Sequence, residues 1–472
     1  MDKINWLEEV IKRKEELIAD LQGLLHIKSV LDEENRKPDA PFGEGVKEAL
    51  LYMLEKGNNA GFQTKNLDNL AGHLEFGNGE QLLGILCHVD VVPEGDGWNY
   101  DPYGAEIHNG KIYARGALDD KGPTIAAFYA MKIVHELRLP LSKRVRMIIG
   151  TDEESKWRCV EHYFKSEEMP TIGFAPDADF PIIHAEKGMV ELELTYDEEL
   201  AKDDKSLFEV HSFHSGRRYN MVPDYAEVIM KTTSNFDDLI ANFEQFLSEK
   251  KLSGQVEKKT ETELRFVLKG VSAHAMEPNN GKNAGLYLAA FLAEQNIDGR
   301  AKQYFQFLTN YFFEDSRGIK LGINYRDAVS GDLTVNIGIL NYEKSQTGNV
   351  GINIRYPVTY QFEGAKNIID RLVQDYPFHV THYANSEPHY VEESHPLIQT
   401  LQKVYERQTG EKAELLAIGG GTYARSLKAG VAFGPLFPGR QDVAHQKDEY
   451  MELEDLLKAT AIYAEAIYEL AK

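Results

Sequence analysis

Two nearly continuous apolar runs, over residues 82–92 and 145–150, constrain the fold of this chain more than any other feature. Strands that are buried on both faces of a sheet have this composition, whereas strands with one solvated face alternate polar and apolar residues. Helical patterns cover residues 5–25, 45–56 and 122–137, and a shorter strand pattern covers residues 171–175. Because strands alternate with helices, the sequence predicts an α/β fold with a mixed sheet sandwiched by helices.

The pattern changes after residue 187. Strand patterns at 190–196 and 226–232, a helix at 236–247 and a strand at 261–268 form one group. A similar order returns with strands at 333–340 and 349–355, a helix at 365–375 and a strand at 379–383. We interpret these groups as two related β-β-α-β halves of one inserted α+β domain, called the lid. The prediction is a first domain made of residues 1–187 and 384–472, interrupted by a lid over residues 188–383.

Length and charge exclude several classes of protein. A chain of 472 residues is too long for one ordinary core, which agrees with two domains. A net charge of −23 argues against nucleic acid or an anionic membrane as a partner. The chain has no apolar run long enough for a membrane span, its first residues lack a signal-peptide core, and two cysteines cannot form a disulfide framework. We therefore expect a cytoplasmic protein.

Polar motifs follow the apolar runs, and the first contains His88 and Asp90. Residues two apart in a strand point to the same side of the sheet. An imidazole that binds a metal usually donates its other N–H to an acceptor, which Asp90 could supply. Asp90 could also hold the loop in place. Taken alone, a histidine at a strand end beside an aspartate is more often structural.

Further carboxylates occur at Asp119, Glu153, Glu154 and Asp177, and a second histidine, His445, lies near the C-terminus. Asp119 could be a helix cap or a bridging metal ligand. Adjacent carboxylates such as Glu153 and Glu154 diverge, so one could bind metal while the other serves as a general base, although a solvated acidic loop has the same composition. Alone, Asp177 would be a turn residue and His445 a surface histidine. Two histidines and several carboxylates in this order are the ligands of a two-metal hydrolase.

Four motifs, at residues 84–93, 113–116, 119–122 and 151–155, occur in the order found in one known family. Through them the chain resembles the M20 family of metallopeptidases over essentially its whole length. Within that family it is similar to the bacterial dipeptidase V group, whose members are Xaa-dipeptidases described as carnosinase-like.

The resemblance implies a role for each motif residue. His88 and Asp177 would bind one metal ion, and Glu154 and His445 the other, with Asp119 bridging both. Two further motif residues would not bind metal. Glu153 would be the general acid and base, and Asp90 would support His88.

The lid and a glycine-rich loop would contribute further residues. His274, in a motif over residues 270–275, would reach the substrate carbonyl, while Asn220 and Arg355 would hold the substrate C-terminus. The alternatives are a surface histidine, an Asn-capped turn and a surface arginine, but a guanidinium suits a carboxylate well. Gly420 lies in a run of three glycines that lacks the phosphate-loop pattern, so we expect a close backbone approach to substrate there. The doubled lid predicts a monomer.

The predicted function is a two-metal dipeptidase that hydrolyses unblocked dipeptides with a metal-bridging water activated by Glu153. The ligand set suits Zn²⁺ or Mn²⁺, with Co²⁺ as a further option. The alternative is a metal-dependent deacylase for N-acyl or N-succinyl amino acids. A binding protein that has lost catalysis is disfavoured, because every ligand and the candidate base are present.

Overall fold

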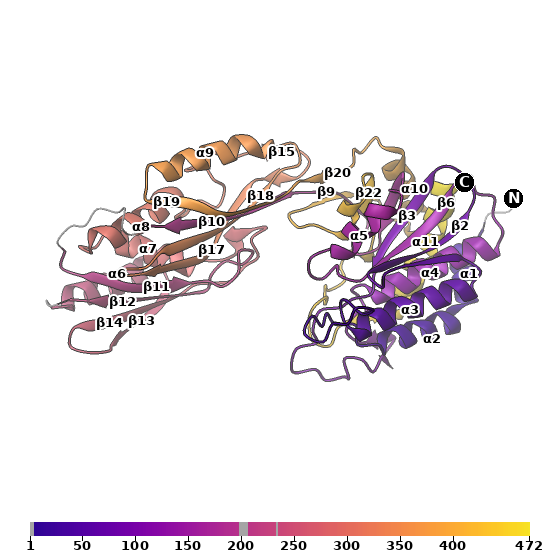
Figure 1. Cartoon of the computed structure of the whole chain (residues 1–472), viewed down its shortest axis with the longest axis horizontal. Helices are drawn as coiled ribbons and strands as arrows, with labels where there is room; N and C mark the ends of the chain where they lie inside the picture. Colours follow the sequence, from indigo (N-terminus) through magenta and orange to yellow (C-terminus); the bar gives the residue numbers. More distant parts are fainter. Residues whose placement is uncertain (1–3, 198–205, 233–234) are drawn as a thin grey trace. The chain divides into compact units, whose positions relative to one another are not determined.

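The computed structural model describes residues 4–197, 206–232 and 235–472, which form two compact units (Figure 1). The first unit comprises Met1–Ala185, Tyr390–Ala417 and Gly421–Lys472, and the second comprises Glu186–His389 and Ile418–Gly420. None of the helices in the described ranges has both the length and the apolar character that a membrane span needs.

The first unit is built on a nine-stranded mixed sheet, whose main path has the order β1-β2-β6-β3-β7-β22-β9-β20, with β21 paired to β9. Its strands are β1 (Gln63–Leu67), β2 (Ala71–Gly77), β3 (Leu82–His88), β6 (Arg144–Gly150), β7 (Ile172–Ala175), β9 (Ile182–Glu186), β20 (His389–Tyr390), β21 (Leu415–Ile418) and β22 (Gly430–Ala432). In the series β6-β3-β7-β22 each strand is parallel to the next. Strand β1 pairs antiparallel with β2, β2 pairs antiparallel with β6, and β9 pairs antiparallel with β22.

Helices cover both faces of this sheet. They are α1 (Trp6–Ile11), α2 (Lys14–Leu25), α3 (Glu44–Asn59), α4 (Lys121–Glu136), α5 (Arg158–Ser166), α10 (Pro396–Thr409) and α11 (Leu453–Ala471). One continuous core contains side chains from the helices α1, α2, α3, α4, α10 and α11. These side chains pack against alternate residues of the strands, such as Ile85 and Met147. Helix α5 packs against β2 on the other face, where Tyr163 contacts His73. The predicted helix-sandwiched mixed sheet is confirmed.

The predicted helix over residues 5–25 is divided into α1 and α2. The guanidinium of Arg13 donates to the carbonyl oxygen of Glu9 at 2.7 Å and also contacts Glu136 of α4. The side chain thus satisfies a carbonyl near the end of α1 at the point where the helix stops. Apolar spacing alone does not reveal this break, because it continues through both helices.

Short pairings complete the first unit. A three-stranded sheet joins β4 (Glu106–His108), β5 (Lys111–Tyr113) and β24 (Tyr450–Glu452), and a two-stranded one joins β8 (Ala178–Asp179) to β23 (Pro435–Leu436). The short helix η3 (Tyr423–Ser426) follows the glycine run.

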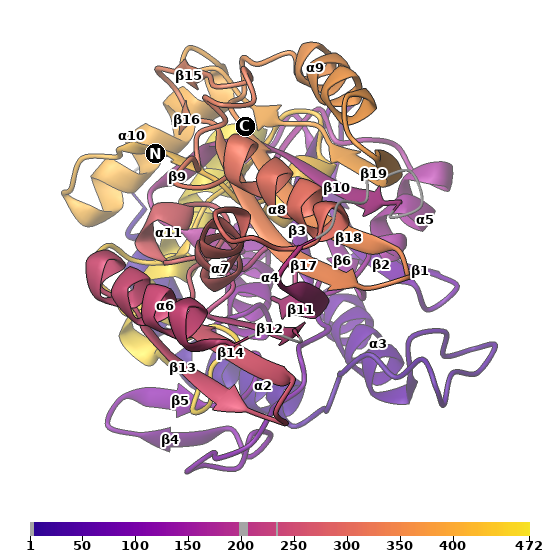
Figure 2. The ribbon, with the colours of Figure 1, turned by 90° about the vertical axis from the view of Figure 1, so that its left-hand side faces the viewer.

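The second unit contains an eight-stranded antiparallel sheet with the order β13-β14-β12-β11-β17-β18-β10-β19. The strands are β10 (Gly188–Tyr196), β11 (Glu209–Ser215), β12 (Tyr225–Lys231), β13 (Ser253–Lys258), β14 (Glu263–Lys269), β17 (Thr334–Glu343), β18 (Gly348–Tyr356) and β19 (Phe378–Ser386). The helices are α6 (Asp237–Lys250), α7 (Ala284–Ala293), α8 (Gly299–Tyr311) and α9 (Phe362–Gln374), with the short η2 (Pro278–Asn280) and the two-stranded β15 (Arg326–Asp327) and β16 (Gly331–Asp332) beside them. The four α-helices share one core with alternate strand residues and can be followed in Figure 2.

The two β-β-α-β halves of this unit are β11-β12-α6-β13 and β17-β18-α9-β19, and they meet where β11 pairs with β17. Each half has one further strand beside its second strand. In the first half this strand is β14, which follows β13 in the chain, but in the second half it is β10, which comes from the start of the unit. Residues 190–196, which the sequence pattern assigns to the first half, therefore pair with the second.

The unit boundaries differ from the predicted domain limits of 187/188 and 383/384. Strand β19 continues to Ser386 and pairs with β10, so a cut after residue 383 would divide a strand. Most of β19 is solvent-exposed, and its sequence lacks the alternation that would mark its end. Ile418–Gly420, expected in the first domain, groups with the second unit. The division into a catalytic domain and a lid stays a prediction.

The helices α7 and α8 were not predicted from the sequence, and their packing can be tested at Leu308. This residue of α8 is fully buried in the second core. We expect Leu308→Ala to lower the free energy of unfolding by about 2–5 kcal/mol, because it removes buried methyl groups and leaves a cavity. Leu207→Ala, at a leucine that is 53% exposed, is the matched control. Urea denaturation followed by circular dichroism measures both; equal effects would contradict the described packing.

Candidate active site

The candidate site lies in the first unit, at the edge where three parallel strands end. Strand β3 ends at His88, β6 ends three residues before Glu153, and β7 ends two residues before Asp177. Because parallel strands present their carboxyl ends at the same edge, the loops after them meet there. The topology therefore explains why motifs almost ninety residues apart share one site.

His88 has no exposed surface. Its Nδ1 lies 3.0 Å from the carbonyl oxygen of Asp90, an arrangement in which Nδ1 carries the proton and donates it. Its Nε2 lies 3.2 Å from Asp119 Oδ1 and 3.7 Å from Asp177 Oδ1, yet makes no hydrogen bond. A nitrogen lone pair that faces carboxylate oxygens needs a proton or a metal cation between them.

Asp119 lies between the two histidines. Its Oδ1 faces His88, and its Oδ2 lies 3.0 Å from Nε2 of His445. The same His445 nitrogen is 3.1 Å from both carboxylate oxygens of Glu154. The structure thus brings together all five residues that the sequence suggested as metal ligands.

The geometry of these side chains fits divalent metal ions. Two sets of three side chains each offer ligand atoms within 4.8 Å of one another: His88 with Glu153 and Asp177, and His88 with Asp119 and Glu154. Imidazole and carboxylate donors suit Zn²⁺ and Mn²⁺. Since Glu153 belongs to the first set, distance alone does not separate a ligand from a base, and its role stays a prediction.

The carboxylate of Asp90 holds the loop of Glu153 and Glu154 through backbone N–H groups. Asp90 Oδ1 accepts a hydrogen bond from the N–H of Glu153 at 3.2 Å, and its Oδ2 accepts one from the N–H of Glu154 at 3.1 Å. Its carboxylate is also 3.5 Å from Nδ1 of His88. Both interpretations of Asp90 therefore have a physical basis: its carbonyl orients the imidazole, and its side chain holds the next loop.

Two residues that sequence reasoning did not single out also shape the site. Asp120 is fully buried, follows a cis peptide bond after Asp119, and accepts the N–H of His88 at 3.1 Å. Tyr423 of η3 packs edge-on against the His88 ring, with ring centroids 6.0 Å apart. The position of Asp120 directly after the candidate ligand Asp119 could have indicated that it belongs to the site. Nothing in the sequence places Tyr423 beside His88.

Burial and the crowding of acidic groups shift the pKa values of the site toward its protonated forms. Burial, and then the charge of Asp177, raise the pKa of Glu153 well above its usual range. Burial and the charge of Asp119 raise the pKa of Glu154 to about 7. Hydrogen bonds to Asp119 and Glu154 raise the pKa of His445 to about 11. Each shift favours the protonated form, and a bound metal cation would provide positive charge in place of that proton.

The second unit contains the other predicted residues, and it brings His274 next to Asn220. Met221 and His274 form an antiparallel bridge, and the N–H of Ala275 donates to the carbonyl oxygen of Asn220 at 2.9 Å. Burial, and then the positive charge of Arg355, lower the pKa of His274. The imidazole therefore favours its neutral form.

Arg355 is only 6% exposed, which differs from the surface arginine considered as an alternative. Its Nη1 donates to the carbonyl oxygen of Gly419 at 3.1 Å, and its Nε donates to Asn353 at 2.8 Å. A Cβ added to Gly419 would lie 2.8 Å from Cβ of Met276, whereas one added to Gly420 would meet no atom within 4 Å. Close packing in this loop is thus found at Gly419, against Met276, and at Gly421, where a Cβ would lie 2.5 Å from Nη1 of Arg425, but not at Gly420.

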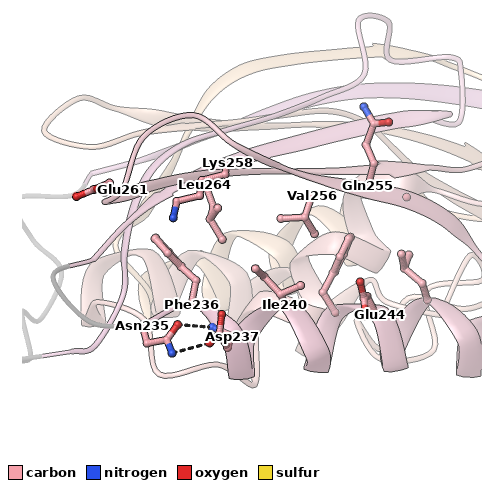
Figure 3. A pocket seen from close by; sticks show the side chains of 13 residues that line it. Asn235, Phe236, Asp237, Ile240, Glu244, Gln255, Val256, Lys258, Glu261 and Leu264 are labelled. Atoms are coloured by element: carbon pink, nitrogen blue, oxygen red, sulfur yellow. Dashed lines mark hydrogen bonds between the residues drawn. The ribbon is translucent and has the colours of Figure 1, made fainter.

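Two cavities elsewhere lack the chemistry of this site. One of about 360 Å³ lies in the second unit between α6 and the β13–β14 hairpin, where Asn235 and Asp237 hydrogen-bond to each other (Figure 3). The other, of about 1020 Å³, lies in the first unit beside Phe180 and Tyr405. Neither contains a histidine or a cysteine.

Comparison with known proteins agrees with this geometry. The family described as "Peptidase family M20/M25/M40" matches residues 84–469. A protein of Bacillus subtilis (strain 168), named as a candidate dipeptidase, YtjP, is 56% identical over 469 residues, which cover 99% of this chain and 100% of the relative. A candidate dipeptidase of Staphylococcus epidermidis (strain ATCC 12228 / FDA PCI 1200) is 46% identical over 98% of this chain and 99% of its own. The fold resembles aminoacylhistidine dipeptidase from Vibrio alginolyticus, with a TM-score of 0.59 and 12% identity over 97% of this chain and 96% of that one.

The metal site can be tested by thermal stability. We expect the cluster to bind cations only in the folded state, so Zn²⁺ or Mn²⁺ at a hundredfold excess over Kd should stabilise the protein by about 2.7 kcal/mol. The rise in Tm should disappear in His88→Ala and persist in His162→Ala, since His162 pairs with Asp68 on the surface. Differential scanning calorimetry measures it. A rise that survives in His88→Ala would place metal binding elsewhere.

Proposed function

The chain belongs to peptidase family M20/M25/M40, and on that premise we propose that it is a dipeptidase dependent on two divalent metal ions. It is a metallopeptidase, and therefore a hydrolase, whose substrates are small peptides. The finer assignment to unblocked dipeptides is supported by the names of relatives that match it along their whole length.

The observation that carries the two-metal proposal is the position of Asp119. One of its carboxylate oxygens faces His88 and the other faces His445. In this proposal His88 and Asp177 would hold one ion, His445 and Glu154 would hold the other, and Asp119 would be a ligand common to both. The buried Nε2 of His88, which has no hydrogen-bond partner, supports the same assignment.

The ions supply, when bound, a water of lowered pKa and a positive charge beside the scissile carbonyl. Glu153 accepts the proton of the attacking water and later donates it to the leaving amine. Its half-buried position near Asp177, where burial and that charge raise its pKa, suits a carboxyl group that must hold a proton during the reaction. Asp90 acts indirectly, because it fixes the backbone of Glu153 and orients His88.

The lid residues bind the substrate in this proposal. Neutral His274 donates a hydrogen bond to the developing oxyanion, and Arg355 binds the substrate carboxylate with Asn220. Gly420 allows the backbone to approach the substrate, since no side chain occupies the space at its Cα. A free carboxylate bound at a fixed distance from the scissile bond would select short substrates.

Other properties are proposed from the sequence. Two lid halves in one chain support a monomer, because the second half supplies the surface that a partner subunit would otherwise provide. Zn²⁺ binds more tightly than Mn²⁺ in the usual affinity order, but metal supply can reverse that preference. The cytoplasm is the proposed location.

The substrate class is tested with protein stripped of metal and reloaded separately with Zn²⁺ and Mn²⁺. We expect metal-dependent hydrolysis of free dipeptides and little of tripeptides, N-acetylated dipeptides or N-succinyl amino acids. Steady-state rates for the panel measure this. Preferential cleavage of the acylated compounds would identify a deacylase, and inactivity with either ion would contradict the enzymatic proposal.

The base is tested with Glu153→Ala. Without a general acid and base, kcat should fall by about 10²–10⁴-fold, while two metal ions stay bound. Glu161→Ala in α5, at an exposed glutamate of the same unit, is the control and should be unaffected. Steady-state kinetics and metal analysis by mass spectrometry are the measurements. If Glu153→Ala lost one ion together with activity, Glu153 would be a ligand instead.

A further inference from the structure

We propose that Glu449 is a positioning residue of the metal centre, which fixes the backbone of Asp119 relative to the His445 loop. The inference rests on the proposed two-metal function and adds a residue outside the ligand set. Glu449 follows His445 by four residues and is fully buried.

The contacts of Glu449 reach the segment that contains the bridging carboxylate. Its Oε1 accepts hydrogen bonds from the N–H groups of Leu118 at 2.8 Å and Asp119 at 3.1 Å. Its own carbonyl oxygen accepts the N–H of Ala114 at 3.1 Å. Two charge-assisted hydrogen bonds to consecutive amides define the position and direction of that peptide segment.

Arg115 holds the other oxygen of Glu449. Its Nη1 donates to Oε2 at 2.5 Å, and the guanidinium is almost completely buried. Longer contacts, of 3.3 to 3.4 Å, join it to the carbonyl oxygens of Gln446 and Pro93. Arg115 therefore contacts the loop that carries His445 and the segment that follows His88 and Asp90.

This arrangement matters because Asp119 must face two histidines at once. Its two oxygens lie 3.2 Å from His88 and 3.0 Å from His445. A shift of its backbone would lengthen at least one of these distances. Since Glu449 belongs to the same loop as His445, it fixes Asp119 relative to one of these two histidines directly.

A buried ion pair can also serve stability alone, and the first unit contains a suitable comparison. Arg146 of β6 and Glu75 of β2 form an Arg–Glu pair at 2.5 Å that is also largely buried. Their strands pair in the sheet, and neither residue contacts His88, Asp119 or His445 in the contacts described. Breaking this pair should cost stability without changing the metal site.

The test compares Glu449→Gln with Glu75→Gln. Each removes one negative charge from a buried Arg–Glu pair and keeps the shape of the side chain. The dissociation constants for Mn²⁺ and Zn²⁺ are measured by competition with a chromogenic chelator, together with the Tm of the metal-free protein. We expect Glu449→Gln to weaken metal binding by about 10–100-fold, the range found when groups that orient ligands are changed. Glu75→Gln should lower Tm but leave the dissociation constants within about twofold.

The absorption spectrum of the Co²⁺-loaded protein is a second readout, because it reports ligand geometry independently of turnover. It should change in Glu449→Gln and not in Glu75→Gln. Wild-type metal affinity in Glu449→Gln, or equal weakening in both variants, would overturn the proposal. Absence of metal binding in the wild-type protein would instead refute the two-metal function, and the positioning role with it.

Discussion

The structure depends on concentrating carboxylates around one buried imidazole. His88 and Asp120 have no exposed surface, and Asp90 is only 3% exposed. Buried charges of like sign are costly unless hydrogen bonds and counter-charges compensate them. Hydrogen bonds to the histidines keep the pKa of Asp119 low although burial opposes this, whereas burial raises the pKa of its neighbour Asp120. The cluster therefore carries negative charge that protons neutralise only in part and that divalent cations would neutralise more fully.

The same carboxylates also build the site mechanically, because each is hydrogen-bonded to the backbone of a different loop. Asp90 holds the amides of the Glu153 loop, Asp120 holds the amide of His88, and Glu449 holds the amide of Asp119. The loops at the end of the sheet are thus linked to one another as well as to their strands. A metal ligand on a loop can be placed accurately when its backbone is fixed at this many points.

The sequence predicted the features whose cause is local or repeated. Apolar runs marked β3 and β6, and the polar motifs after them marked residues that the structure brings together in the candidate site, since the ends of parallel strands lie together. It did not predict β13, an edge strand whose only large apolar residue is Val256, or α7, which is apolar on nearly every side and has no period. The sequence also did not predict the roles of three residues in the site, Asp120, Tyr423 and Glu449. These roles come from contacts over long sequence separations or with backbone amides, and such contacts leave no pattern of residue types.

The doubled lid shows why a domain limit need not appear in a sequence. Strand β10 occupies, in the second half, the position that β14 has in the first, so the chain enters and leaves this unit through the adjacent strands β10 and β19. The first and last strands of the unit are therefore hydrogen-bonded neighbours. The contacts of Ile418 with Lys187, and of Gly419 with Arg355, add three residues from a remote part of the chain. Both bonds end on backbone carbonyl oxygens, which any residue type offers, so a boundary drawn from composition fell inside β19 and excluded the glycine loop.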